Sequence, residues 1–233
     1  MNDAALKRFA DFVDERKEDI WWTHVDDAHN NFSKYVISLL QDRYGLAGKQ
    51  VLDVGCGTGR DLKAFAELGA IPTGMTLYEE EALTECKLPY IVADQAFNDL
   101  PEKSYDIVFA RHVLEHSLAP FFTLVSYNRL LKANGTLYVE VPAPDQKTGH
   151  ELNHNHYSVF GLEMWQTLIK RAGFEIKTIL RLPINSFDAE GNIIENADLW
   201  YGFICEKYRD DVVPSKEWWT LVEPLFKNGF KIE

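Results

Sequence analysis

The 233-residue sequence lacks any long apolar run. No stretch approaches the roughly 18 uninterrupted apolar residues that a membrane-spanning helix needs. Residues 1–19 are of mixed charge and lack the apolar segment of a secretory signal peptide. We therefore expect a soluble, cytoplasmic chain without a membrane span.

Cysteine is scarce. Cys56, Cys86 and Cys205 are widely spaced and odd in number, so they support neither a disulfide framework nor a zinc site. We expect all three to be reduced and structural.

Basic residues are outnumbered. The 24 Lys and Arg against 36 Asp and Glu leave a formal net charge of −12. Because nucleic-acid binding depends on basic groups that neutralise phosphates, a long DNA or RNA substrate is disfavoured. The charge balance therefore disfavours a nucleic-acid partner, and the oligomeric state is left open.

What the sequence does contain is a regular alternation of strand and helix patterns after Gln50. Strands that alternate with helices predict a parallel sheet with right-handed crossovers. The last two apolar runs, Phe174–Leu182 and Leu199–Cys205, have no helical segment between them and should pair antiparallel. We therefore expect an α/β, doubly wound, Rossmann-like sheet of seven strands, mostly parallel with an antiparallel last strand. The expected strands are Val51–Val54, Ile71–Leu77, Tyr90–Ala93, Tyr105–Ala110, Thr136–Val141, Phe174–Leu182 and Leu199–Cys205.

The most informative stretch is residues 51–62, where a buried apolar strand runs directly into a glycine-rich turn and then a helix. Glycines let a ligand approach the main chain, and a helix N-terminus supplies free amides suited to an anion. Ligands of open α/β sheets bind at the carboxyl ends of the strands, where this loop falls. A dinucleotide fingerprint would need its third glycine at Arg60, so the spacing does not match it.

This loop resembles motif I of the class I S-adenosylmethionine (AdoMet)-dependent methyltransferases, and the resemblance extends from about Val51 to Phe174. It implies AdoMet as cofactor, with the loop wrapped around its methionine part and Asp53 helping to orient it. The implied loop contacts are Asp53, Gly55, Cys56, Gly57, Thr58 and Gly59.

The end of the second strand departs from the family, which usually has an acid there that binds the ribose. This chain has Thr76 followed by Leu77. A similar variant in the cyclopropane-synthase branch places a ribose-binding glutamine at the position of Glu81. The resemblance thus implies Thr76, Leu77 and Glu81 as ribose contacts, although Glu81 also suits a solvated helix N-terminus.

After the third strand, Asp94 matches the family's acceptor for the adenine amino group, with Gln95 and Ala96 beside it. As a turn residue, Asp94 would need no ligand. At the end of the fourth strand, the segment from Arg111 to His116 matches a pattern found in small-molecule methyltransferases. It implies that Arg111 and His112 face the cofactor or the substrate.

Histidines gather after the fifth strand, where this superfamily places substrate residues. Histidine suits a general base near neutral pH, so His112, His154 and His156 are the catalytic candidates, and we assign no metal site. Two alternatives remain: the histidines after the fifth strand bind a divalent metal ion, or this segment is a polar lid over the pocket. The metal alternative would use His150, His154 and His156 with Glu140 or Asp145, and the aromatic Trp21-Trp22 patch with His24 is expected to cover the substrate.

The sequence thus predicts an AdoMet-dependent methyltransferase acting on an oxygen or nitrogen of a small polar metabolite or sugar-like acceptor. The alternatives are a non-catalytic binding or scaffold protein of the same fold and, less favoured, an NAD-dependent oxidoreductase. We expect an N-terminal helical cap at residues 1–48, the methyltransferase core at 49–210 and a helical tail at 211–233.

Overall fold

The computed structural model describes residues 3–16, 27–79, 81–187 and 193–227. The expected Trp21-Trp22 and His24 cover lies outside these residues. The helices are α1 (Asp3–Arg16), α2 (Asp27–Tyr44), α3 (Arg60–Glu67), α4 (Glu81–Cys86), α5 (Pro120–Leu130), α6 (Leu162–Arg171) and α7 (Ser215–Lys227), with short 3-10 helices η2 (Leu114–His116) and η3 (His150–Leu152). The strands are β1 (Gln50–Val54), β2 (Ile71–Thr76), β3 (Tyr90–Val92), β4 (Tyr105–Arg111), β5 (Leu131–Pro142), β6 (Phe174–Phe187) and β7 (Ile193–Lys207).

The strands form a seven-stranded sheet in the order β3-β2-β1-β4-β5-β7-β6. Strand β1 pairs in parallel with β2 and β4, and β4 pairs in parallel with β5. Strand β7 runs antiparallel to both of its neighbours, β5 and β6. The predicted doubly wound α/β fold with an antiparallel last strand is therefore confirmed.

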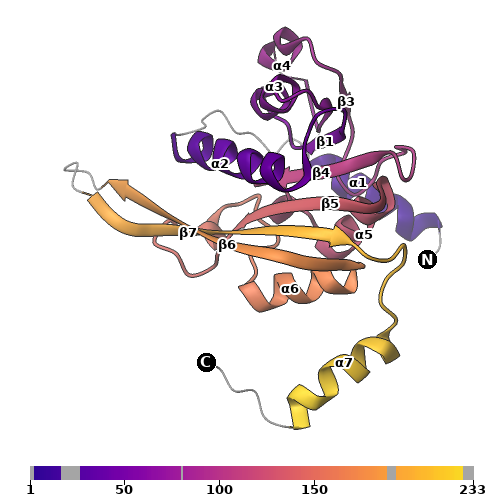
Figure 1. The fold of residues 1–233 in the computed structure, drawn as a ribbon. Helices are drawn as coiled ribbons and strands as arrows, with labels where there is room; N and C mark the ends of the chain where they lie inside the picture. Colours follow the sequence, from indigo (N-terminus) through magenta and orange to yellow (C-terminus); the bar gives the residue numbers. More distant parts are fainter. Residues whose placement is uncertain (1–2, 17–26, 80, 188–192, 228–233) are drawn as a thin grey trace.

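The β6–β7 hairpin is longer than the apolar runs predicted. Its pairing continues out to Phe187 and Ile193, and the hairpin projects beyond the rest of the sheet (Figure 1). Two paired strands satisfy each other's backbone hydrogen bonds without a buried face. The outer part therefore has no continuous apolar run that would mark it in the sequence.

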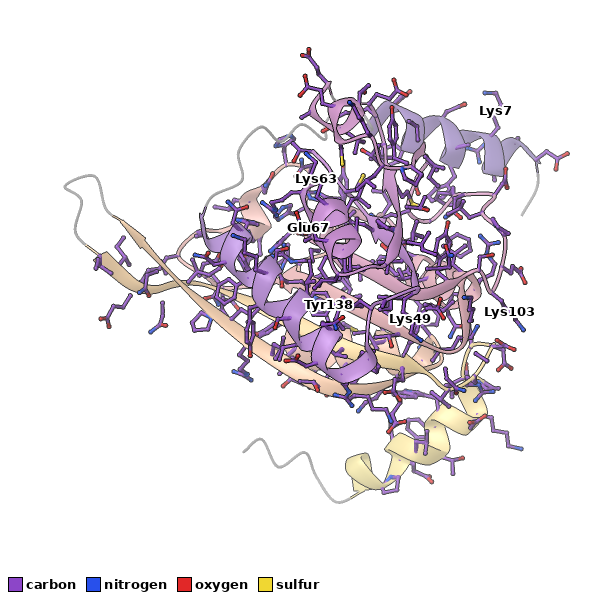
Figure 2. All side chains as sticks on the ribbon, turned by 45° about the horizontal axis from the view of Figure 1, so that its top comes forward. Lys7, Lys49, Lys63, Glu67, Lys103 and Tyr138 are labelled. Atoms are coloured by element: carbon purple, nitrogen blue, oxygen red, sulfur yellow. The ribbon has the colours of Figure 1, made fainter. Side chains whose placement is uncertain are left out.

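Helices cover both faces of the sheet (Figure 1). On one face, Val36 and Leu40 of α2 and Phe65 of α3 are fully buried in a cluster with Val51 and Phe109 of the strands. Helix α3 fits this position because Leu62 and Phe65, three residues apart, face inward. Its polar Lys63 and Glu67 lie on the outer side (Figure 2).

On the other face, α5 and α6 pack Tyr127 and Trp165, both fully buried, against the sheet. Cys56, Cys86 and Cys205 are free and buried. Among the described residues, no helix has the length and apolar character to cross a membrane.

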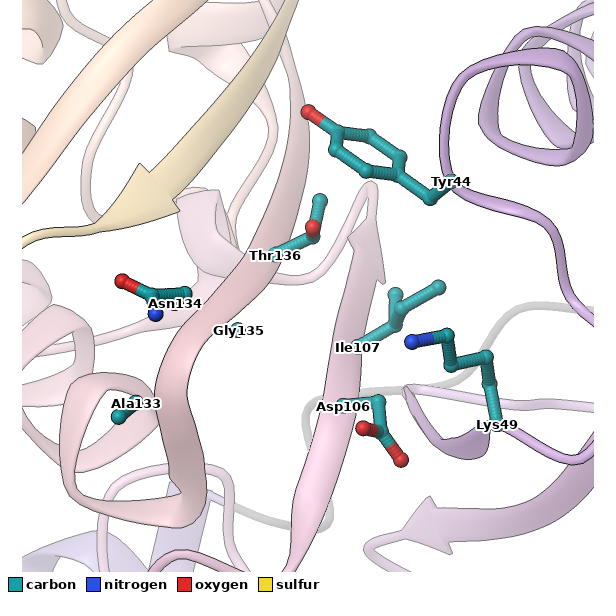
Figure 3. Close-up of a pocket in the computed structure, with 8 residues that line it drawn as sticks. All are labelled: Tyr44, Lys49, Asp106, Ile107, Ala133, Asn134, Gly135 and Thr136. Carbon is teal, nitrogen blue, oxygen red and sulfur yellow. The ribbon is translucent and has the colours of Figure 1, made fainter.

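A cavity of about 220 Å³ opens at the amino edge of the sheet, between Tyr44, Lys49, Asp106 and residues 133–136 (Figure 3). Asp106 accepts hydrogen bonds from Lys132 Nζ at 2.7 Å and from the Gln50 amide at 2.9 Å. The glycine loop lies at the opposite, carboxyl edge. The cavity therefore belongs to the scaffold, and we place the functional site elsewhere.

Replacing Asp106 by Asn is expected to cost about 0.5–1 kcal/mol of unfolding free energy at pH 7. Partial burial raises the pKa of Asp106, but the bonds from Lys132 and Gln50 outweigh it and hold the pKa below its ordinary value of 3.8. The stabilisation is thus present above that value and is lost as the pH falls through the lower pKa of the folded state. Urea unfolding at pH 7 and pH 3 should show the gap between wild type and variant shrinking at pH 3. The exposed Asp99→Asn is the control, and a gap that does not change with pH would contradict the ion pair.

Candidate functional site

The glycine loop adopts the backbone conformation that its sequence predicts. Gly55, Gly57 and Gly59 have φ angles of 72°, 49° and 75°, in the left-handed region that favours glycine. The amides of Gly55 and Cys56 both donate to the Met75 carbonyl, at 2.8 and 3.1 Å. The loop is therefore fastened to the carboxyl end of β2 before any ligand arrives.

The three glycines serve different purposes. A Cβ atom at Gly55 would lie 2.9 Å from Val113 Cγ2, and one at Gly59 would lie 2.8 Å from Cys86 Sγ. At Gly57, an added Cβ would meet no atom within 4 Å. Gly55 and Gly59 are thus required by packing, whereas Gly57 borders the open space that a cofactor would fill.

Asp53, in the strand just before the loop, is 3% exposed, and its Oδ2 has no hydrogen-bond partner among the described residues. Burial and the nearby Asp61 carboxylate raise its pKa. A buried carboxylate oxygen without a partner is costly. The ammonium group of a methionine moiety would supply the missing donor, so Asp53 and Gly57 fit the expected cofactor.

The expected ribose and adenine contacts remain predictions. Hydrogen bonds within the protein limit which atoms of these residues are available to a ligand. Thr76 donates its hydroxyl hydrogen to the Tyr78 carbonyl at 3.0 Å, which leaves only its lone pairs for a ribose. Glu81 is exposed at the start of α4, which also fits a solvated helix N-terminus. Asp94 Oδ1 accepts from the amides of Ala96 and Phe97, at 2.7 and 3.1 Å, and so stabilises its own turn.

Gln95 joins the loops after β3 and β4. Its Nε2 donates to the Val113 carbonyl at 2.7 Å, and its Oε1 accepts from the buried Tyr127 hydroxyl at 2.6 Å. Both ends of the amide are thus engaged within the protein. We expect Gln95 to shape the cofactor pocket rather than to hydrogen-bond the cofactor.

Arg111, at the carboxyl end of β4, is the centre of a buried ion-pair network. Its Nη2 and Nε lie 2.6 and 3.0 Å from Glu140 Oε1, and its Nη1 lies 3.4 Å from Asp61 Oδ2. Burial opposes both charges, but the pairing outweighs it, raising the pKa of Arg111 and lowering that of Glu140. Ser33 of α2 donates to Asp61 at 2.6 Å, so the network ties α2 to the helix that follows the cofactor loop.

His112 has a positive φ of 49° and lies between two carboxylates. Its Nδ1 is 3.4 Å from Glu115 Oε1 and its Nε2 is 3.0 Å from Glu140 Oε1. Burial lowers the pKa of His112, but Glu115 and Glu140 outweigh it and raise the pKa to about 9. An imidazolium cannot accept a proton at neutral pH. His112 is therefore better suited to stabilise the Glu115 and Glu140 carboxylates than to act as the expected base.

The structure places the candidate histidines in different surroundings. His156 lies in a ring cluster with its centroid 4.9 Å from that of His116 and 5.6 Å from that of His150. Burial lowers the pKa of His156 to about 4, so it is neutral at pH 7. His154 is exposed, and His112 packs instead against Trp200 and His29, with centroids 4.3 and 4.8 Å apart.

The metal ligand set considered from the sequence is not the one that the structure brings together. Glu140 is engaged with Arg111, and its Oε2 accepts from the Tyr138 hydroxyl at 2.6 Å. Within the described part of the chain, the group close enough to hold an ion is Glu115, His116 and His156. The spacing of these three residues in the sequence does not predict this group. It forms because η2 places Glu115 beside the loop that carries His156.

Sequence reasoning missed Asp198 and gave Trp200 no role. Strand β7 pairs Trp200 with Pro142 and thereby places both residues at the carboxyl end of β5. Asp198 Oδ1 and Oδ2 lie 2.9 and 2.8 Å from His150 Nε2, and Trp200 Nε1 donates to Oδ2 at 2.8 Å. An acid immediately before the start of the expected strand Leu199–Cys205 carries no signal that could have indicated this contact.

Comparison with known proteins identifies the family of this chain. A family model described as "Methyltransferase domain" matches residues 12–179. The ubiquinone biosynthesis O-methyltransferase of Pseudomonas savastanoi pv. phaseolicola is 27% identical over 208 residues, covering 81% of this chain and 85% of the relative. The enzyme of the same description from Pseudomonas aeruginosa (strain LESB58) is 24% identical over 217 residues, covering 78% and 89%.

Solved structures share the fold. The 1,6-didemethyltoxoflavin-N1-methyltransferase of Burkholderia thailandensis, with bound S-adenosylhomocysteine, has a TM-score of 0.63 at 21% identity and covers 88% of this chain and 89% of its own. The [4+2]-cyclase SpnF has a TM-score of 0.62 at 16% identity, covering 80% and 85%, so the fold alone does not decide the reaction. The family match spans more than half of the chain, and this chain belongs to the methyltransferase domain family, whose cofactor is S-adenosylmethionine.

Proposed function

We propose that the protein transfers the methyl group of AdoMet to a hydroxyl oxygen of a small polar or sugar-like acceptor. The relatives described as O-methyltransferases support oxygen as the acceptor atom. A nitrogen acceptor, as in the name of the structural neighbour, is the second candidate. A cytoplasmic location stays a prediction from the sequence.

The observation that carries this proposal is the His150–Asp198 pair. A hydroxyl must lose its proton during transfer, and a histidine oriented by a carboxylate is suited to receive it. Because Asp198 holds Nε2 of His150, Nδ1 is the nitrogen left to take the proton. Asp198 is itself fixed by Trp200 Nε1 and by the Leu199 amide, so the pair is rigid.

AdoMet, when bound, supplies a methyl group already activated by its sulfonium. As the acceptor oxygen takes up the methyl group, with S-adenosylhomocysteine as the leaving group, its proton would pass to Nδ1 of His150. The protein has to orient the acceptor toward the methyl group and exclude water from the site. Asp53 and the open side of Gly57 would hold the methionine part, and the Arg111–Glu140 network would keep the carboxyl end of β4 in place beside it.

The first experiment is calorimetric titration with AdoMet, S-adenosylhomocysteine and NAD. We expect binding of the two sulfur compounds and none of NAD. Acceptors, beginning with sugars and small hydroxy acids, are then screened by release of S-adenosylhomocysteine. Cofactor binding without turnover of any acceptor would favour the non-catalytic alternative, and failure to bind either sulfur compound would contradict the methyltransferase.

With an acceptor in hand, His150→Gln and Asp198→Asn are expected to lower kcat by about 10²–10⁴-fold at neutral pH. Binding of S-adenosylhomocysteine should be retained, because the pair joins η3 to β7, and neither element carries the glycine loop. Parallel His154→Ala and His156→Ala variants test the bases expected from the sequence. A full kcat in His150→Gln with a large loss in one of these would move the proton acceptor to that histidine.

A further inference from the structure

Three metal-binding side chains meet beside the expected methyl-transfer site. Glu115 and His116 belong to η2, which follows β4, and His156 belongs to the loop after β5. One possible ligand atom from each of the three lies within 4.8 Å of the other two. Val113, two residues before Glu115, lies against Gly55, so the group is near the glycine loop.

The loop that carries His156 is fastened to η2 independently of any ligand. The amides of Tyr157 and Ser158 donate to the Glu115 carbonyl, at 2.8 and 3.0 Å. The Ser158 hydroxyl donates to the Ser117 carbonyl at 2.9 Å. These bonds fix the distance between the two segments, so the group is pre-organised.

His116 is oriented from behind. Its Nδ1 lies 2.9 Å from the Asn155 carbonyl oxygen, so Nδ1 carries the hydrogen and Nε2 presents its lone pair. A backbone carbonyl in this position is the usual partner of a metal-binding histidine, because it fixes both the tautomer and the ring.

Two of the three residues carry buried polar atoms without partners. Glu115 is 1% exposed, and neither its Oε2 nor His156 Nδ1 has a hydrogen-bond partner within the described ranges. Leaving such atoms unsatisfied is costly, and each instance needs an explanation. The cation near Glu115, His112, approaches the other oxygen, Oε1, and so does not account for Oε2.

We propose that Glu115, His116 and His156 bind a divalent transition-metal ion, which in turn binds an oxygen of the methyl acceptor. Two imidazoles and one carboxylate are the donors that Zn²⁺, Co²⁺ and similar ions prefer over Mg²⁺ or Ca²⁺. Three protein ligands leave coordination positions open, as in catalytic sites. The acceptor class that follows has two neighbouring oxygens, a vicinal diol or a 2-hydroxy acid.

The ion's role rests on the proposed function, although the site itself does not. A hydroxyl bound to a divalent ion has a lowered pKa, so it gives up its proton more readily to His150, whose ring stacks on that of His156. The metal ligand His156 and the proton acceptor His150 then have separate tasks.

The test uses the full, untagged chain after treatment with a chelator. Zn²⁺ and Co²⁺ are titrated by calorimetry, and the visible absorption of Co²⁺ is recorded. Wild type should bind one ion per chain, with the Co²⁺ bands of a four- or five-coordinate site containing nitrogen. His116→Ala and His156→Ala should each weaken binding at least about tenfold, whereas the exposed His154→Ala, in the same loop, should bind the ion like wild type.

The proposal is overturned if wild type binds neither ion, or if both ligand variants bind as wild type does. Circular dichroism in the presence of chelator checks that the variants are folded, and the wild-type Co²⁺ spectrum reports nitrogen ligands without any variant. S-adenosylhomocysteine binding is measured in the same chelated samples. If wild type binds S-adenosylhomocysteine but no metal ion, the metal site alone is rejected. If wild type does not bind S-adenosylhomocysteine, the proposed function is rejected.

Discussion

Gly57→Ala is expected to weaken S-adenosylhomocysteine binding by at least about a hundredfold. The new methyl group would meet no protein atom within 4 Å, so the folded chain can accommodate it. It would instead occupy space that the methionine part of the cofactor needs. The positive φ of 49° adds a backbone cost of about 1–2 kcal/mol for any residue with a Cβ atom. Calorimetric titration of wild type and variant measures the effect.

Gly48→Ala is the matched control. Gly48 also has a positive φ, 75°, and open space around its Cβ position, but it lies in the turn between α2 and β1. Both variants should lose similar stability in urea, and only Gly57→Ala should lose the ligand. Equal, near-native affinity in both would show that the cofactor does not approach Gly57 and would remove the basis for the loop assignment.

Arg111→Met is expected to lower the free energy of unfolding by about 3–5 kcal/mol, because it removes the buried guanidinium that bridges Glu140 and Asp61. Glu140 is fully buried and Arg111 is 8% exposed, so water cannot replace the lost charge. Cofactor affinity should also fall, since Arg111 reaches Asp61 in the helix after the glycine loop. Urea unfolding and calorimetry measure the two effects.

Lys103→Met serves as the control for this second result. Lys103 forms an ion pair with Asp210 at 2.9 Å, but the two side chains are 55% and 59% exposed, and Lys103 extends outward from the body (Figure 2). Such pairs contribute about 0–1 kcal/mol. If the two variants lost equal amounts, the Arg111 network would be no more than a surface ion pair in energetic terms.

The parts of the molecule that the sequence predicts are those with local causes. Buried strand segments such as residues 107–110 are continuous apolar runs, and the turn after β1 needs glycines in any context. The antiparallel direction of β7 followed from the absence of a helical segment between the last two apolar runs. The outer parts of β6 and β7 were missed because hairpin pairing, not a buried face, holds them.

The acceptor side could not be predicted to the same depth, because its contacts join distant segments. His150 meets Asp198 from 48 positions away, and His116 meets Asn155 from 39 away. A sequence shows that histidines are present, and only packing shows which carboxylate each one faces. His112 illustrates this: its type suggests a base, and its two carboxylate neighbours make it a cation.

The strand order has a consequence for synthesis on the ribosome. Strand β7 lies between β5 and β6, so β6 leaves the ribosome before the strand that will join it to the sheet. Until residue 207 has emerged, both β5 and β6 present unpaired edges, which are prone to aggregation. Asp198 and Trp200 arrive on the same late strand. The nascent chain therefore completes its sheet and its acceptor site in one step, and a chain broken off before β7 would have neither.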